Sequence, residues 1–514
     1  MIDRDGKKTS LWQATAEPYA SKPDSGDRGF DVIVVGGGIT GISTAYLLQK
    51  AGFRCALVEA ESICYGTTGG TTAHLNTIMD TPYNEIEQKF GKQSAALVHK
   101  CASDALDLIR ANIFLHEIDC DFAEQEAFLF AVKEKEEKQL ESIYNATVDA
   151  GVYARFTDRI PIPVPYRKAM NVKGQASFHP VKYVHGLAFA FEQAGGCIFE
   201  HCRLLETTEK EEVEISTTMG TFHSKYLIYA THTPPGVHFL HTRLIPYRCY
   251  AMAVKLLDAS YPEHLCYDMM DPYHYYRTQM INGDEYLIAG GEDHKTGDDI
   301  QTSTCFLKLE AEVNRIFRVS EIHYRWSSQF YESVDGLPYI GFMPGSDKVM
   351  VATGFGGNGM TYSSVAALLF KDILLNNPNP ATELFSPSRL KLLAGFSRFV
   401  KHNAGAVKEL VQKMLPTPAL EVLADMAPGE ARVVKFEDKK LGIYKHEDGN
   451  ISAVEPSCTH MGCDVHWNDA EESWDCPCHG ARYKPSGEVL NGPSTQGLNE
   501  VNIAVETEKN KSTH

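Results

Sequence analysis

The sequence predicts a mixed α/β protein that carries a small all-β domain near its C-terminal end. Residues 30–60, FDVIVVGGGITGISTAYLLQKAGFRCALVEA, have the pattern of a buried strand, a glycine turn, a helix over 39–50 and a second strand over 54–59. Asn282 and Gly283 separate two strand-like runs, which predicts a two-residue hairpin and hence an antiparallel sheet. From about residue 424 the chain changes to short strands with Gly and Pro turns.

Length and charge limit the classes of protein to which this chain could belong. At 514 residues, two or three domains are expected, and a net charge of -18 argues against a nucleic-acid partner. No run of 18 apolar residues is present, which argues against a transmembrane segment, and residues 1–27 lack the apolar stretch of a signal peptide. These features predict a cytoplasmic protein with an N-terminal extension over residues 1–27.

The first glycine turn predicts a dinucleotide site. Gly36, Gly38 and Gly41 satisfy G-x-G-x-x-G between a strand and a helix, where the turn, the approach of pyrophosphate and helix packing each require a missing side chain. Glu59 follows at the end of the second strand, where a carboxylate can accept hydrogen bonds from ribose hydroxyls.

A second glycine pattern, Gly354, Gly356 and Gly359, could indicate a separate NAD site. The helix after it runs into NNPNP rather than into a second strand ending in an acidic residue, so the βαβ context is missing. We therefore expect a helix start that faces the other end of the same cofactor.

The middle of the chain alternates helices, expected over 94–118 and 133–151, with strands. NNPNP marks a boundary at about residue 380, and a basic helical linker is expected over 381–423, with a net charge of +5 between residues 386 and 415. This linker could contact an anionic membrane surface, but packing against acidic domains of the same chain is the favoured interpretation.

Five segments in this order resemble the D-amino-acid-oxidase-like family of FAD-dependent oxidoreductases: DVIVVGGGITGISTAYLL, YGTTGGTTAHLN, FHPVKYVHGLAFAFEQAGG, LIYATHTPP and DGLPYIGF with GFGGNGM. The resemblance covers residues 28–380 and implies a Rossmann-type FAD domain with an interleaved antiparallel substrate domain. It implies that the ADP half of FAD is held by Gly36, Gly38, Gly41 and Glu59. It further implies contacts with the pyrophosphate and flavin from Thr67, Thr68, Thr72, Gly356, Gly357, Gly359 and Met360.

The family oxidises C–N bonds of amines and amino acids, which implies a small-molecule substrate. Amino-acid oxidases of this type generally bind the carboxylate with an arginine shortly before DG-x-P, where this chain has Phe330 and Tyr331. Side chains alternate between the two faces of a strand, so one face of the hairpin should carry Tyr273, Tyr275 and Arg277. Arg277 is the only cation among them. We expect this face to meet the substrate, with Tyr275 and Arg277 as candidate catalytic residues; a packing role for these side chains is the alternative.

Four of the thirteen cysteines lie within 21 residues near the C-terminal end, and the other nine are scattered without ligand spacing. Cys458, His460, Cys476 and His479 form C-x-H followed by C-x2-H, which zinc could also use. An unliganded disulfide knot is a further alternative.

The segments CTHMGC and CPCHG, with WDCPCHGARY and GEVLNGP, resemble the Rieske family over residues 424–508, followed by a tail over 509–514. The resemblance implies a 2Fe-2S cluster with Cys458 and Cys476 on one iron and His460 and His479 on the other. It also implies a disulfide between Cys463 and Cys478. High-potential members have a serine where this chain has Ala481, while Tyr483 is kept.

FAD accepts two electrons and a 2Fe-2S cluster carries one, so the pair predicts an enzyme that oxidises a C–N bond and passes electrons singly to an unidentified acceptor. Electron flow from cluster to flavin is chemically permitted as well. A redox sensor or electron carrier without small-molecule turnover is the alternative from a different class.

Overall fold

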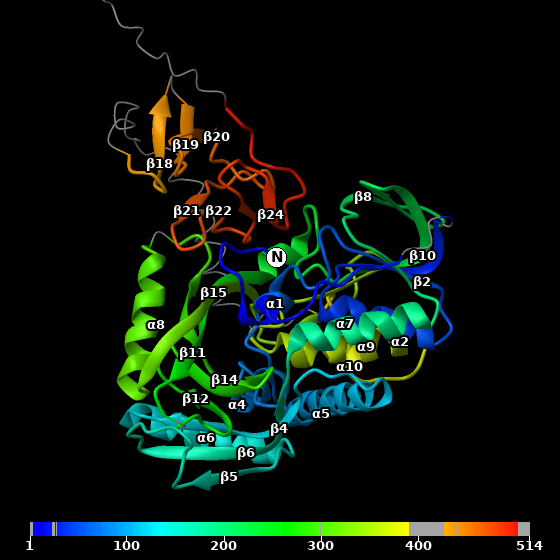
Figure 1. Ribbon diagram of the computed structural model, residues 1–514. Helices are drawn as coiled ribbons and strands as arrows, with labels where there is room; N and C mark the ends of the chain where they lie inside the picture. Colours follow the sequence, from blue (N-terminus) through cyan, green and yellow to red (C-terminus); the bar gives the residue numbers. More distant parts are fainter. Residues whose placement is uncertain are drawn as a thin grey trace, which may run out of the picture.

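The computed structural model describes residues 4–22, 26, 28–258, 260–298, 300–389, 426–436 and 439–501. They form two large sheets with helices packed around them and two small sheets near the C-terminal end (Figure 1). The linker helix predicted within 381–423 lies outside the described residues from residue 390 onward.

The first large sheet contains the predicted βαβ unit. Its strands follow the order β16-β17-β10-β1-β2-β7, and β8 and β9 extend from β10. β1 runs parallel to β2 and β10, and its apolar residues 32–35 are buried, as is typical of a parallel strand covered on both faces. The bounds are β1 (Gly29–Val35), β2 (Cys55–Val58), β7 (Cys197–Phe199), β8 (Leu204–Glu209), β9 (Val213–Thr217), β10 (Gly220–Tyr229), β16 (Tyr339–Phe342) and β17 (Val349–Thr353).

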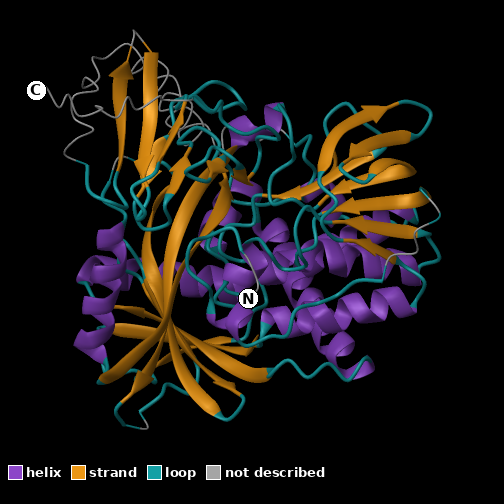
Figure 2. Cartoon of the chain, turned by 45° about the horizontal axis from the view of Figure 1, so that its top comes forward, coloured by secondary structure: helices purple, strands orange, loops and turns teal. Residues whose placement is uncertain are grey.

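The second large sheet is mostly antiparallel, in the order β15-β11-β14-β13-β12-β4-β6-β3, with β5 beside β6. Figure 2 shows it strongly twisted and separated from the first sheet by helices. The predicted hairpin is confirmed, because Ile281 pairs with Asp284 and the two residues between them both have positive φ. The bounds are β3 (His74–Leu75), β4 (Ala123–Ala131), β5 (Ala154–Thr157), β6 (Lys168–Ser177), β11 (Leu244–Leu256), β12 (Leu265–Asp268), β13 (His274–Ile281), β14 (Asp284–Lys295) and β15 (Val319–Ser333).

The helices confirm the predicted helix over 39–50, and the helices predicted over 94–118 and 133–151 correspond to α5 and α6. Within the described residues α9 is followed by α10 rather than by a strand, so the second glycine pattern does not open a second βαβ unit. No helix in this part of the chain is long and apolar enough to cross a bilayer. The bounds are α1 (Leu11–Ala14), α2 (Ile39–Lys50), α3 (Thr67–Gly70), α4 (Tyr83–Phe90), α5 (Lys92–Leu115), α6 (Glu134–Asp149), α7 (Pro180–Gln193), η1 (Phe239–Arg243), α8 (Ser303–Ile316), α9 (Gly359–Leu374) and α10 (Ala381–Leu384).

The C-terminal residues form two small antiparallel sheets, β18-β19-β20 and β21-β22-β23-β24. The predicted mixed α/β fold with a small all-β C-terminal part is therefore confirmed. The bounds are β18 (Ala431–Phe436), β19 (Lys439–Lys445), β20 (Ile451–Val454), β21 (His466–Asn468), β22 (Ser473–Asp475), β23 (Arg482–Tyr483) and β24 (Val489–Asn491).

Residues near the N-terminus join the C-terminal sheets to the rest of the molecule. Arg482 donates a hydrogen bond from its guanidinium to the Asp5 carbonyl at 2.7 Å, and the Lys7 amide donates to the Glu471 carboxylate at 2.7 Å. Ser327 on β15 donates to the same carboxylate at 2.6 Å. Since these groups are largely buried, the contacts fix the small sheets against β15.

Candidate functional site

A cavity of about 360 Å³ extends from the glycine turn after β1 to the second large sheet. Gly36 and Gly38 line it, whereas Gly41 packs behind them: a Cβ at Gly41 would lie 1.8 Å from the carbonyl oxygen of Gly36. α2 begins here with Gly38 as its N-cap, so its positive end points to the cavity. This end of the cavity suits a pyrophosphate.

Glu59 lines the same end of the cavity. Its two carboxylate oxygens accept hydrogen bonds from the amides of Gly37 at 2.6 Å and Glu61 at 2.9 Å. Burial raises the pKa of Glu59, and these two hydrogen bonds act in the opposite direction. The carboxylate is thus fixed by backbone donors with acceptor capacity left for ribose hydroxyls.

Thr67, Thr68 and Thr72 line the cavity beside α3. The Thr68 hydroxyl accepts a hydrogen bond from the Ile39 amide at 3.1 Å and so connects α3 to the start of α2. The Thr67 hydroxyl donates to the Gln329 carbonyl at 3.1 Å. Thr67 therefore contacts β15, and Thr68 contacts the glycine-turn end of the cavity, which we call the nucleotide end.

The start of α9 forms a further wall, which contains Gly356, Gly357, Gly359 and Met360. Gly356 has φ +58, a conformation that favours glycine. Asp80 also lines the cavity and accepts a hydrogen bond from the Gly357 amide. Burial raises the pKa of Asp80 to about 6. Two helix N-termini, those of α2 and α9, therefore face one cavity.

The antiparallel sheet supplies the opposite end of the cavity, which we call the substrate end. Tyr275 lines it, but Arg277 does not. The guanidinium of Arg277 is fully buried, lies 5.2 Å from the Trp12 ring centre and donates to the Phe178 carbonyl at 3.4 Å. Burial lowers the pKa of Arg277 to about 9. The two residues thus share a sheet face, yet only the tyrosine reaches the cavity.

Tyr273, which the sequence placed on the hairpin face expected to meet the substrate, lines this end, and so do three residues that were not predicted: Tyr267, His74 and Cys249. Tyr267, His74 and Cys249 come from three different strands, β12, β3 and β11. The His74 imidazole lies 2.6 Å from the Tyr267 hydroxyl through Nδ1, and burial lowers its pKa well below the usual value. No motif in the sequence connects these positions, because only the fold of the sheet brings them together.

The four predicted cluster ligands lie together in the C-terminal domain. The rings of His460 and His479 are 5.0 Å apart, and both side chains are nearly buried. The thiols of Cys458 and Cys476 are hydrogen-bonded to each other, which lowers the pKa of Cys458 and raises that of Cys476, so the two ligand sulfurs lie side by side. His460 donates from Nε2 to the Gly236 carbonyl at 3.1 Å. Its buried Nδ1 has no hydrogen-bond partner among the described residues and is left as a lone-pair donor.

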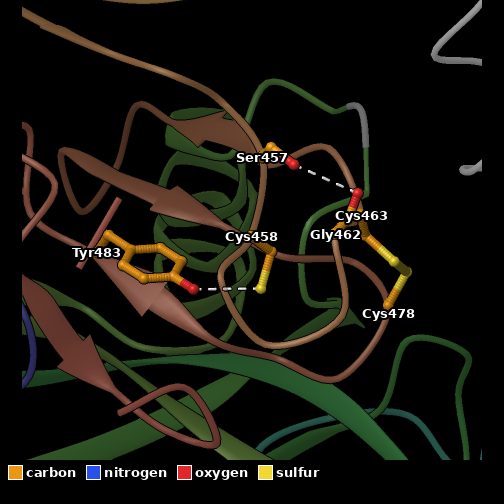
Figure 3. The surroundings of a disulfide bond; sticks show 6 residues. All are labelled: Ser457, Cys458, Gly462, Cys463, Cys478 and Tyr483. Atoms are coloured by element: carbon orange, nitrogen blue, oxygen red, sulfur yellow. Dashed lines mark hydrogen bonds between the residues drawn. A yellow bond between two sulfur atoms is a disulfide. The ribbon is translucent and has the colours of Figure 1, made fainter. Parts of the chain in front are cut away.

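A disulfide joins Cys463 and Cys478 next to these ligands (Figure 3). The sulfur atoms of these two residues and Cys476 lie within 4.8 Å of one another. Because the disulfide takes two of the four sulfurs, Cys458 and Cys476 remain as thiol ligands. Figure 3 also shows the Tyr483 hydroxyl directed at the Cys458 sulfur, at 3.2 Å. Two thiols and two imidazoles fit a mixed Cys and His cluster.

The two cluster histidines face the part of the molecule that contains the two large sheets, rather than solvent. The His241 ring, in η1, lies 4.7 Å from the His460 ring and 5.9 Å from the His479 ring. Tyr331 on β15 donates to the His479 carbonyl at 3.2 Å, and its ring lies 4.7 Å from that of His232, which lines the cavity. The cavity and the cluster site are thus separated by a wall about two side chains thick.

Comparison with known proteins agrees with this geometry. A family model described as FAD dependent oxidoreductase (DAO) matches residues 31–373. The chain belongs to this family. A second model, described as Rieske [2Fe-2S] domain, matches residues 419–502. The protein therefore has FAD and a Rieske 2Fe-2S cluster as its cofactors.

Relatives share one or both parts. YhfW of Bacillus subtilis, named for a Rieske 2Fe-2S iron-sulfur protein, is 35% identical over 96% of this chain and 97% of its own. Gamma-glutamylputrescine oxidoreductase of Escherichia coli is 24% identical over 71% of this chain and 88% of its own. Glycine oxidase of Geobacillus kaustophilus has a similar fold, with a TM-score of 0.60 at 19% identity over 71% of this chain and 99% of its own.

Proposed function

We propose that the protein oxidises a C–N bond of an amine or amino-acid-like substrate and passes the electrons singly through the Rieske centre to an acceptor outside the chain. The contact between cavity and cluster site carries this proposal. His232 lines the cavity, Tyr331 packs on its ring, and Tyr331 donates to the His479 carbonyl. A short protein route between two redox sites favours electron transfer within one chain.

The residues that line or support the cavity have distinct roles in this proposal. The ADP half of FAD is assigned to Gly36, Gly38, Gly41 and Glu59. The pyrophosphate and flavin are assigned to Thr67, Thr68, Thr72, Gly356, Gly357, Gly359 and Met360. When bound, FAD would supply a two-electron acceptor for the hydride equivalent that the substrate carbon loses, while the substrate nitrogen loses a proton and the C–N bond becomes an imine. The α9 N-terminus, which lines the cavity, would supply positive charge to a flavin that becomes negative on reduction.

The cluster ligands are assigned as Cys458, Cys476, His460 and His479. We also propose that the Cys463–Cys478 disulfide forms in the cell, in the cytoplasm, where burial beside the cluster would protect it from the reducing thiol pool. Reduction of this disulfide in purified protein should require unfolding conditions if burial is what protects it.

Anaerobic mixing of the protein with a panel of amines and amino acids tests the function. A substrate should bleach the flavin absorption band, and the electron paramagnetic signal of a reduced cluster with mixed Cys and His ligation should grow with it. In a His479→Cys variant the flavin should still bleach, but that signal should be absent. Bleaching by no compound, with a cluster that still exchanges electrons, would favour the carrier instead. Flavin reduction only after the cluster is reduced would favour reverse flow.

A further inference from the structure

The two ends of the cavity differ in the charge of the groups that line them. Among the described lining residues, Arg203 is the only lysine or arginine, and its guanidinium pairs with Glu61 at 2.6 Å at the nucleotide end. Arg277, the cation that the sequence offered for the substrate, is buried outside the lining against Trp12. A substrate carboxylate would therefore lose its hydration at the substrate end without gaining a positive partner.

Aromatic rings make up much of the substrate end. The ring centres of Tyr273 and Tyr275 are 5.8 Å apart, and Tyr267 lines the same region. The Tyr275 hydroxyl lies 2.9 Å from the Cys249 sulfur, and the Tyr267 hydroxyl lies 2.6 Å from His74. Because these two hydroxyls already have protein partners, the tyrosines offer a ligand mainly their rings, and tyrosine ring faces attract cations.

Negative groups surround this aromatic wall. Asp80 lines the cavity, and Asp293 lies behind Cys249 and Tyr273, with which it interacts. One oxygen of the Asp293 carboxyl is buried and accepts no hydrogen bond from the described residues. Burial, together with the nearby charges of Asp80 and Glu332, raises the pKa of Asp293 to about 7. A buried carboxylate in this position is stabilised by a cation in the cavity.

We propose that the substrate is a cationic amine without a carboxylate, held with its ammonium group against the tyrosine wall near Asp80 and Asp293. This inference rests on the proposed function, since it names the substrate class of the same site. Three features of the described residues point to this substrate class together: an aromatic lining, nearby carboxylates, and no lysine or arginine in the lining of this end.

Matched pairs of compounds test the inference. Each pair differs only by a carboxylate: methylamine and glycine, phenethylamine and phenylalanine, 1,4-diaminobutane and ornithine. In at least one pair the amine should bleach the flavin anaerobically with a second-order rate constant at least about tenfold above that of the amino acid, which equals about 1.4 kcal/mol. Faster bleaching by the amino acid in every reactive pair would overturn the substrate class and leave C–N oxidation intact.

Binding of a permanent cation separates this inference from turnover. Benzyltrimethylammonium should bind to the flavin-loaded protein more tightly than its neutral isostere neopentylbenzene, and Asp293→Asn should weaken its binding about tenfold. Asp258→Asn, which removes a partly exposed carboxylate that does not line the cavity, is the control and should leave binding unchanged. If the cation binds but no amine or amino acid bleaches the flavin, the proposed C–N oxidation is overturned and the preference of the site for cations is supported. Equal binding of cation and isostere in the wild-type protein would overturn the cation preference.

Discussion

The nucleotide end and the substrate end belong to one cavity but are built from different parts of the chain. At the nucleotide end, the turn that contains Gly36 and Gly38 offers backbone amides and the start of α2, all within one βαβ unit. At the substrate end, side chains from several strands of the second sheet meet, among them Tyr267 on β12 and Tyr275 on β13. One end depends on missing side chains and the other on the side chains that are present.

This difference predicts how each end responds to substitution. Adding atoms should damage the nucleotide end, because its turn and helix are packed closely. Changing charge or aromatic character should damage the substrate end while the cofactors stay bound. The cluster site should be sensitive to both kinds of change. Two short loops supply its ligands, and neighbouring side chains adjust the potential of the cluster.

The largest effect is expected from Gly41→Ala. The added Cβ would lie 1.8 Å from the Gly36 carbonyl oxygen, so the turn or the helix has to shift. We expect FAD to bind about 100-fold more weakly, of the order that overpacking costs. The FAD content of purified protein and titration of the apoprotein measure this. Gly26→Ala, where the added Cβ meets no atom of the described residues within 4 Å, is the control, and the cluster signal should persist in both variants. Unchanged FAD affinity would contradict the proposed packing role of Gly41.

The second prediction concerns pH at the substrate end. A carboxyl with a raised pKa is neutral below that pKa and negative above it, so binding of benzyltrimethylammonium should be strong above pH 7. It should weaken as the pH falls through about 7 for Asp293 and about 6 for Asp80. The neighbouring Cys249, Tyr273 and His74 stay neutral in this range, because burial raises the first two pKa values and lowers the third.

Calorimetric titration between pH 5.5 and 8.5 measures this profile with a probe that does not itself titrate. In the Asp293→Asn variant the fall near pH 7 should disappear, and affinity at high pH should drop about tenfold. A wild-type profile that stays flat over the whole range would show that neither carboxyl senses the bound cation.

A smaller effect is expected from the aromatic wall itself. Tyr275→Phe keeps the ring and removes the hydroxyl, whereas Tyr275→Leu removes the ring and keeps much of the apolar volume. The leucine variant should bind benzyltrimethylammonium about fivefold more weakly, and the phenylalanine variant should bind it almost normally, since the ring provides the attraction. Equal losses in both variants would assign the effect to the hydroxyl and its contact with Cys249 instead.

The same division explains what the sequence could predict. G-x-G-x-x-G, the hairpin pair Asn282-Gly283 and the C-x-H and C-x2-H ligands are local patterns, and each constrains a short stretch of backbone. Arg277 was predicted on the correct sheet face, but alternation along a strand does not say how far a side chain reaches. Its partner Trp12 comes from the N-terminal segment, which carries no motif for this role. Asp293 reaches the substrate end through β14 of the second sheet, and Asp80 is held by hydrogen bonds to Gly357 and Asn358 at the start of α9, so no local sequence pattern marks either residue.

The smallest expected effect concerns the potential of the cluster. Ala481 is fully buried, and its carbonyl accepts a hydrogen bond from the Cys476 amide at 2.8 Å, which places it beside a ligand cysteine. Tyr483 donates toward Cys458 from the other side. A hydroxyl donor to a cluster sulfur stabilises the more negative, reduced state, so the absence of a serine here should keep the potential below the upper end of the roughly -150 to +300 mV Rieske range.

Ala481→Ser should therefore raise the potential. One hydrogen bond of about 0.5–1.5 kcal/mol corresponds to about 20–60 mV for a single electron. The acidic residues nearby should matter less than their number suggests, because Asp464 pairs with Lys440 at 2.9 Å and Asp475 with Arg482 at 3.1 Å. Tyr483→Phe is the matched opposite change and should lower the potential by a similar amount. Spectroscopic redox titration of both variants checks this, and shifts of the same sign would contradict tuning by hydrogen bonds to sulfur.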